Sequence, residues 1–223
     1  TLESKSRGIL QLAKTLGISS AEAHANCVLG DSLVAQGRLL EAQEAYAEYL
    51  RIVSLNLERE PGVNRWQRRL VVAHGRMGDV FMAQGRLGEA RRHFQDGLQL
   101  SRRFALEDPT NVSWQLHLAS AQSRWGSLLE AEGQLAEART AVAEYLSISR
   151  RVAERDPANA GWQADLATAY SRVGDVLQAQ GNVTEAQAAL GESLQICRGL
   201  SERDSTNVNW QSGLAGALSR VGD

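Results

Sequence analysis

The sequence of 223 residues has few cysteines, few prolines and little excess charge. Its two cysteines, Cys27 and Cys197, occupy different positions of the repeat described below, so we predict free thiols in a reducing, cytoplasmic compartment rather than a disulfide framework. Three prolines are too few for a linker-rich chain. The formal net charge of −2 favours no general binding of polyanions. No apolar run approaches the roughly 20 residues of a membrane-spanning helix, and no membrane partner is expected.

Catalytic and metal-binding patterns are missing from the sequence as well. The four histidines, His24, His74, His93 and His117, stand in four different contexts, and none forms a His-x3-His pair or a cluster with cysteine. No spacing suggests a serine–histidine–acid group, and no glycine-rich loop follows a predicted strand. We therefore expect no metal, no cofactor and no enzymatic activity within these residues.

What the sequence does contain is a repeat of 48 residues. A Trp-Gln pair recurs with this step, and glycine recurs at two positions of the same period. A fixed period of this length is typical of a stacked array in which each unit contacts mainly its neighbours. The recurring residues are Trp66, Trp114, Trp162 and Trp210, the glutamine after each, the first glycines Gly30, Gly78, Gly126, Gly174 and Gly222, and the second glycines Gly37, Gly85, Gly133 and Gly181.

The hydrophobic pattern predicts an all-α fold built from helix pairs. Apolar residues recur at spacings of three and four, as in Trp162, Leu166, Ala169 and Val173. The second glycines stand where helices commonly end in a left-handed residue, which leaves a hairpin so short that the two helices must be antiparallel. We predict ten helices, near residues 1–16, 21–36, 39–60, 64–84, 86–107, 112–132, 134–155, 160–180, 182–203 and 207–223.

Each repeat unit contains a pair of helices, and we call the first of them helix A. Asparagine and proline stand where each helix A is predicted to begin. An asparagine stands two or three residues before each tryptophan, where its side chain can accept a hydrogen bond from an unpaired backbone N–H. Prolines 61, 109 and 157 lie just before them and prevent the preceding helix, helix B, from continuing. The predicted capping residues are Asn64, Asn111, Asn159 and Asn207.

The period predicts a single repeat array over residues 1–223. Its units cover approximately residues 17–61, 62–109, 110–157 and 158–205, with partial units at 1–16 and 206–223. Because the chain opens in a helix B and stops within a helix A, we expect it to be a piece of a longer array.

Each unit resembles the tetratricopeptide repeat. Counting from the glycine of helix A, that family has a large residue three positions later, then alanine and a bulky residue in helix B. The resemblance recurs four times in phase and implies a right-handed superhelical α-solenoid of antiparallel helix pairs. The matching sets are Gly30, Leu33, Ala42 and Tyr46; Gly78, Phe81, Ala90 and Phe94; Gly126, Leu129, Ala138 and Val142; and Gly174, Leu177, Ala186 and Leu190.

The repeat departs from the family in length. The family unit is typically about 34 residues, so the 48-residue step adds about two turns to each helix of the pair. The Trp-Gln pair lies in the added turns. The chain is thus similar to long-helix arrays that are common in large bacterial proteins.

The tryptophans have two interpretations. They can fill the core between successive helix pairs, or they can form an aromatic ladder that stacks on a ligand. Each lies on the same helical stripe as a leucine four residues later, such as Leu70 or Leu166, and this position favours the core.

The resemblance implies that one face of helix A lines a concave groove that holds a peptide. Arginine and aspartate recur three residues apart there, so we predict same-helix pairs Arg76–Asp79, Arg172–Asp175 and Arg220–Asp223. Ser127 follows Arg124 at this spacing, so Arg124 has no acid on its own helix face. Its guanidinium is expected either to reach Asp79 or Asp175 in a neighbouring unit or to stay available. The face can be a self-neutralising ladder or a polar floor for a peptide. The candidate partner-binding residues are Cys27, Asp31, Arg76, Asp79, Ser123, Arg124, Ser127, Ser171, Arg172 and Asp175.

Two functions remain open at this point. The chain can be a non-catalytic scaffold that binds a protein or peptide partner on the helix-A face. Alternatively, it can be a regulatory or structural arm that packs on a fused effector domain of its own parent protein. No nucleic-acid partner is expected, because basic pairs such as Arg150-Arg151 alternate with acidic residues such as Glu154.

The partial units at the two ends predict self-association. Each end helix lacks the partner that would cover its apolar positions, such as Ile9, Leu12, Leu214 and Leu218. Repeat arrays normally need polar outer faces at their ends. Head-to-tail association of two copies is therefore expected.

Overall fold

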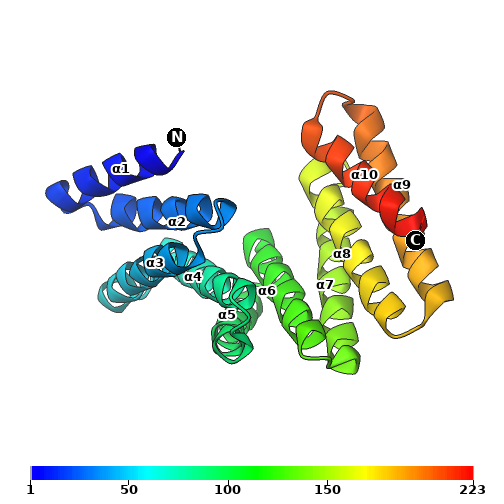
Figure 1. The fold of residues 1–223 in the computed structure, drawn as a ribbon, viewed down its shortest axis with the longest axis horizontal. Helices are drawn as coiled ribbons and strands as arrows, with labels where there is room; N and C mark the ends of the chain where they lie inside the picture. Colours follow the sequence, from blue (N-terminus) through cyan, green and yellow to red (C-terminus); the bar gives the residue numbers. More distant parts are fainter. Residues whose placement is uncertain (1, 223) are drawn as a thin grey trace. The chain divides into compact units, whose positions relative to one another are not determined.

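The computed structural model describes residues 2–222, and within this range it contains ten α-helices and no strand (Figure 1). The all-α prediction is confirmed, and every helix begins and ends within two residues of the predicted position. None of the described helices combines the length and apolar character needed to cross a membrane. The helices are α1 (Leu2–Leu16), α2 (Ser19–Ala35), α3 (Leu39–Arg59), α4 (Asn64–Ala83), α5 (Leu87–Glu107), α6 (Val112–Ala131), α7 (Leu135–Arg155), α8 (Ala160–Ala179), α9 (Val183–Arg203) and α10 (Val208–Gly222).

The chain divides into two compact units, residues 1–101 and residues 102–223. In the first unit α1 packs on α2, α2 on α3 and α3 on α4. In the second unit the helices from α6 to α10 pack on their neighbours in the same consecutive way, and α6 also contacts α8. Helix A corresponds to α2, α4, α6, α8 and α10, and helix B to α3, α5, α7 and α9. The single array over residues 1–223 and its right-handed superhelix stay predictions.

Glycine ends helix A of each complete pair, as predicted. Gly85 has φ of 73°, in the left-handed region that residues with a Cβ seldom adopt. Its N–H donates to Met82 O at 3.0 Å, and the N–H of Arg86 donates to Phe81 O at 2.9 Å. These two bonds form a Schellman motif, which satisfies carbonyls that the helix end would otherwise leave unpaired. Only residues 84–86 separate α4 from α5, so the chain reverses at once.

Asparagine caps three helix-A beginnings but not the first. The side chains of Asn111, Asn159 and Asn207 accept hydrogen bonds from the backbone N–H of the tryptophan three residues later, at 3.3, 3.1 and 3.3 Å. The prediction for Asn64 is wrong, because α4 begins at Asn64 itself and its N-cap is Val63, which makes no side-chain cap. Val63, and not Asn64, stands 48 residues before the capping residue Asn111. The asparagine of this repeat therefore lies one position too late in the sequence to cap the helix.

The glycine of helix A lets helix B approach closely. A Cβ added to Gly78 would lie 2.2 Å from Cε1 of Phe94, and a Cβ at Gly30 would lie 2.3 Å from Cε1 of Tyr46. In the second unit the same position, Gly174, faces Leu190 at 2.6 Å. The bulky residue of helix B therefore occupies the volume that a side chain on helix A would need. This contact accounts for the pattern of glycine and bulky residue that recurs in the sequence.

Tryptophan contributes to the core, although not equally in every repeat. Trp66 and Trp114 are 2% and 4% exposed, and the Trp114 ring stacks on Phe104 with centroids 4.6 Å apart. Trp162 is half-buried against a cluster that includes Tyr145 and Val152. The core interpretation is thus confirmed most fully for Trp66 and Trp114.

The glutamine after each tryptophan has a role that the sequence did not reveal. Nε2 of Gln67 donates to the backbone oxygen of Pro61 at 3.1 Å, and Gln211 makes the same bond to Ser205 at 3.2 Å. Gln115 bonds to Pro109 at 3.4 Å. In these three repeats the glutamine therefore attaches its own helix A to the loop that precedes it.

A pair of glycine substitutions tests the close packing of helices A and B. Gly78→Ala should destabilise the protein by about 1–3 kcal/mol, because the new methyl group overlaps the Phe94 ring. Gly191→Ala is the control: its Cβ would meet nothing within 4 Å in α9, so the higher helix propensity of alanine should stabilise by up to about 1 kcal/mol. The measurement is unfolding in urea. Equal stability of Gly78→Ala and wild type would contradict the packing.

Candidate partner-binding face

The predicted partner-binding residues lie on helices A of both units. We call the side of these helices that carries them the helix-A face, and each unit's part is described by itself. Most of the side chains are half-buried, which leaves them accessible but ordered by neighbours; Ser171 is buried. The first unit contributes Cys27 and Asp31 from α2 and Arg76 and Asp79 from α4; the second contributes Ser123, Arg124 and Ser127 from α6 and Ser171, Arg172 and Asp175 from α8.

In the first unit Asp31 joins two helices. Arg76 on α4 approaches it with Nη2 3.2 Å from Oδ2, and Tyr46 on α3 donates its hydroxyl to Oδ1 at 2.6 Å. Burial, followed by the hydrogen bond to Asp31, raises the pKa of Tyr46 far above its ordinary value. Burial also raises the pKa of the Cys27 thiol one turn before Asp31. Tyrosine and cysteine are therefore neutral at pH 7, and the ionic contact is that of Arg76 with Asp31.

In the second unit a chain of charged contacts runs from α6 through α8 to α10. Nη2 of Arg172 lies 2.8 Å from Ser127 Oγ and 3.0 Å from Glu130 Oε1. Nη1 of Arg172 lies 3.8 Å from Asp175 Oδ2, and Asp175 Oδ1 lies 3.1 Å from Nε of Arg220. Side chains of alternating sign thus connect three successive helices A.

The same-helix pairing was only partly predicted correctly. Arg172 does approach Asp175, but Arg76 pairs with Asp31, and Arg220 pairs with Asp175, each on the preceding helix A. Asp223, the expected partner of Arg220, lies outside the described residues. Both cross-helix pairs are 45 residues apart, three fewer than the period. This spacing could have been read from the sequence. The arginine stands two residues before the glycine of its helix A. The aspartate stands one residue after the glycine of the preceding helix A.

Of the two alternatives for Arg124, that of an available guanidinium is wrong. Nη1 of Arg124 donates to the hydroxyl of Ser120, one turn earlier on the same helix. Ser127, which was expected to leave Arg124 without an acid, accepts instead from Arg172.

A pocket of about 190 Å³ opens between α8, α9 and α10. Ser171, Arg172 and Arg220 line it from the two helices A, and Ser193 and Cys197 line it from α9. The hydroxyls of Ser171 and Ser193 lie 2.8 Å apart and are both buried. Two predicted site residues, Ser171 and Arg172, therefore meet in a concave feature, to which sequence reasoning had not assigned Ser193, Cys197 or Arg220.

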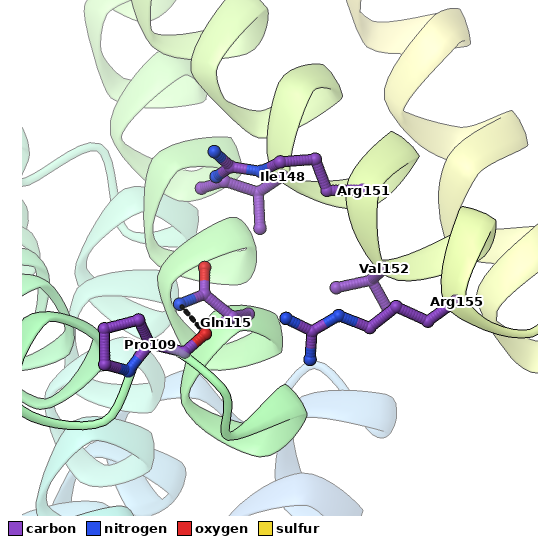
Figure 2. Close-up of a pocket in the computed structure, with 6 residues that line it drawn as sticks. All are labelled: Pro109, Gln115, Ile148, Arg151, Val152 and Arg155. Carbon is purple, nitrogen blue, oxygen red and sulfur yellow. Dashed lines mark hydrogen bonds between the residues drawn. The ribbon is translucent and has the colours of Figure 1, made fainter.

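A second pocket, also about 190 Å³, lies at the loop before α6 (Figure 2). Pro109 and Gln115 form one side and the last turns of α7 the other, with the guanidinium of Arg155 directed toward the loop. Nη1 of Arg155 donates to Thr110 O at 2.8 Å, and Arg203 repeats the bond with Ala158 O at 3.0 Å. Because these bonds recur along the repeat, the pocket belongs to the attachment of the loops.

Two histidines meet in the first unit. Nδ1 of His74 on α4 lies 3.3 Å from Nδ1 of His93 on α5 and 3.7 Å from Oδ2 of Asp96. Burial lowers the pKa of both histidines, while Asp96 raises both and His93 further lowers that of His74. Among residues 2–222 no group of three or more histidine, cysteine or acidic side chains is arranged to hold a metal ion.

Comparison with known protein families detects the repeat in one part of the chain. Residues 166–207, from α8 to the loop before α10, match the family model described as tetratricopeptide repeat. Residues 166–207 therefore carry a tetratricopeptide repeat, and the expected resemblance is confirmed in this part of the chain. The match covers 42 residues, counted from 166 to 207, and contains Gly174, Leu177, Ala186 and Leu190, which carry the family pattern in this unit.

One solved structure supports the all-α fold of helix pairs. The chain is similar to BtubC (BKLC) from P. vanneervenii with a TM-score of 0.68 and 19% identity, over 89% of this chain and 73% of that chain. YrrB, described as a TPR protein with an unusual peptide-binding site, has a TM-score of 0.46 and 18% identity over 92% of this chain and 89% of its own. A search of the curated proteins finds no match.

The histidine pair predicts a loss of stability in acid. The folded pKa values lie below the unfolded value of about 6.5, so the unfolded state binds more protons once the pH falls below it. The stability that the two neutral histidines contribute is then complete above about pH 7 and is lost as the pH falls below their unfolded pKa. Urea unfolding at several pH values measures this. His93→Gln should flatten the profile, whereas His24→Gln on the exposed side of α2 should not; an unchanged slope for His93→Gln would refute the assignment.

Proposed function

We propose that this tetratricopeptide repeat protein is a non-catalytic interaction scaffold whose helix-A face binds a peptide or protein partner. The chain of contacts from Glu130 through Arg172 and Asp175 to Arg220 carries the proposal. These side chains are already held by one another, so binding costs little additional side-chain entropy. They still present donors and acceptors to a ligand, because Arg172 and Asp175 remain 22% and 27% exposed.

The charges on this face indicate what kind of partner fits. In the second unit two acids, Glu130 and Asp175, alternate with two arginines, Arg172 and Arg220. With Arg124 of α6 as a third arginine on this part of the face, the sum is only +1. This small net charge favours a peptide that offers backbone amides and side chains of mixed character over a strongly charged ligand. The free thiols of Cys27 and Cys197 support a reducing location such as the cytoplasm.

The second candidate function is a regulatory arm that contacts an effector domain of its own parent protein. The same face would serve, with the partner in cis. Binding of free peptides by the isolated chain favours the scaffold, and binding of segments of the parent protein alone favours the arm.

Selection from a random peptide library on the immobilised chain tests the scaffold proposal. Peptides selected on wild type should bind at least about tenfold more weakly to Arg172→Ala, because truncation removes the donor at the centre of the face. Arg198→Ala is the matched control, since Arg198 is an exposed arginine on the helix-B side. Affinities are measured by fluorescence anisotropy after urea unfolding has shown that both variants are folded.

Two outcomes would reject the scaffold proposal. One is that no peptide is enriched over an immobilised control protein. The other is that selected peptides lose affinity with Arg198→Ala and keep it with Arg172→Ala, which would move the binding surface to helix B.

We also propose that copies of this 223-residue chain associate through the end helices. On α1 the side chains of Ile9 and Leu12 are 50% and 60% exposed, and on α10 Leu218 is 49% exposed. Burying such apolar surface is favourable at about 25 cal/mol per Å². Sedimentation velocity over a concentration series should show reversible association that Leu12→Glu weakens; a monomer at all concentrations would exclude it.

A further inference from the structure

The pocket between α8, α9 and α10 lies where this repeat lacks a side chain that other repeats have. Position 193 follows positions 49, 97 and 145 at the 48-residue step, and tyrosine occupies two of them, Tyr49 and Tyr145. Gly97 occupies the third, where the backbone of α5 comes close to α4: a Cβ on Gly97 would lie 3.4 Å from Cβ of His74. In α9 the residue is Ser193.

In the preceding repeat, the equivalent space is filled by Tyr145. Its ring is 7% exposed and packs in a cluster with Ala119 of α6 and Ala169 of α8, and its hydroxyl donates to Asp165 O at 3.4 Å. Position 145 thus fills the space between α6, α7 and α8, the three helices that correspond to α8, α9 and α10.

Two residues on the opposite wall of the pocket are also smaller than their equivalents one repeat earlier. Gly213 and Gly216 on α10 line it, and they stand 48 residues after Asp165 and Thr168 of α8. A Cβ on Gly213 would meet only Sγ of Cys197, at 3.9 Å. Smaller residues on both walls open the volume of about 190 Å³. A cavity of about 150 Å³ is sufficient to hold benzene.

The chemistry of the walls suits an aromatic ring with a polar edge. Ala167 and Ala217 are apolar, and the buried hydroxyls of Ser171 and Ser193 are already bonded to each other. Arg172 and Arg220 also line the pocket, and both contact Asp175. Guanidinium groups held in this way can lie against an aromatic face or donate a hydrogen bond to a phenol oxygen. Because Asp175 and Glu130 together offset the two positive charges, a carboxylate is not the preferred ligand.

We propose that this pocket binds one tyrosine or phenylalanine side chain of a partner peptide that lies along the helix-A face. The aromatic ring of the ligand would occupy the space that the protein's own Tyr145 ring fills one repeat earlier. The proposal rests on the proposed function for the source of the side chain, whereas the affinity of the pocket for a phenol ring does not depend on it. Aromatic residues in such pockets commonly dominate the binding energy of an interface.

The first experiment uses p-cresol, which is the side chain of tyrosine, and acetate as the competing chemistry. In a Cys27→Ser background Cys197 is the only thiol. p-Cresol at about millimolar concentration should slow alkylation of Cys197 by iodoacetamide, and acetate should not. Protection by acetate and not by p-cresol would overturn the proposal in favour of an anion site. Protection by neither would overturn it as well.

Filling the pocket supplies the second experiment. Ser193→Tyr restores the residue of Tyr49 and Tyr145 and should abolish p-cresol binding, measured by ligand-observed saturation-transfer NMR. Gln195→Tyr adds a tyrosine on the exposed side of α9 and should leave binding unchanged. Gly216→Thr, which restores the residue found at Thr168, is a second filling variant if Ser193→Tyr does not fold. Equal binding to wild type and a folded filling variant would overturn the pocket.

Peptides separate this inference from the proposed function. Selected peptides that contain tyrosine or phenylalanine should bind at least about tenfold more weakly to Ser193→Tyr than to Gln195→Tyr. If peptides depend on Arg172 but are indifferent to Ser193→Tyr, the pocket proposal fails and the scaffold stands. If p-cresol binds and no peptide is enriched, the pocket stands and the scaffold fails.

Discussion

The close contact between a glycine on helix A and a bulky residue on helix B is the constraint on which each helix pair depends. Only a residue without a Cβ lets the Phe94 or Tyr46 ring lie against the partner helix at the observed distance. A left-handed glycine such as Gly85 then turns the chain within three residues. Helices of 20 and 21 residues are thereby held antiparallel along their length.

Contacts between successive pairs are of a different kind. Trp66, Trp114 and Tyr145 fill the space next to neighbouring helices, while polar links reach back to the previous repeat, as from Arg172 to Glu130 or from Arg220 to Asp175. Exposed ion pairs of this type contribute little stability, typically below about 1 kcal/mol. Their effect is to order side chains on the helix-A face, and an ordered polar surface is suited to recognition.

Variation between repeats is where function is expected in such an array. Residues that recur from repeat to repeat, such as the Trp-Gln pair, have structural roles: Gln67 and Gln115 attach loops, and the Trp66 and Trp114 rings lie in the core. The pocket is lined by residues that differ from those at equivalent positions, namely Ser193, Gly213 and Gly216. Because these residues are smaller than those one repeat earlier, they leave a pocket that is open to solvent and not an enclosed cavity.

The sequence by itself determined the helices, their hairpins and the family, because period, helix-ending glycines and apolar spacing act within a single unit. Even there Val63 was unexpected, since a one-residue offset decides whether Asn64 can cap α4. Only the tertiary structure decided which charges meet and where space remains. Arg76 with Asp31 and Arg220 with Asp175 pair across repeats, because neighbouring helices A bring side chains 45 residues apart within reach of each other. Such distances depend on how helices pack, which no local pattern contains.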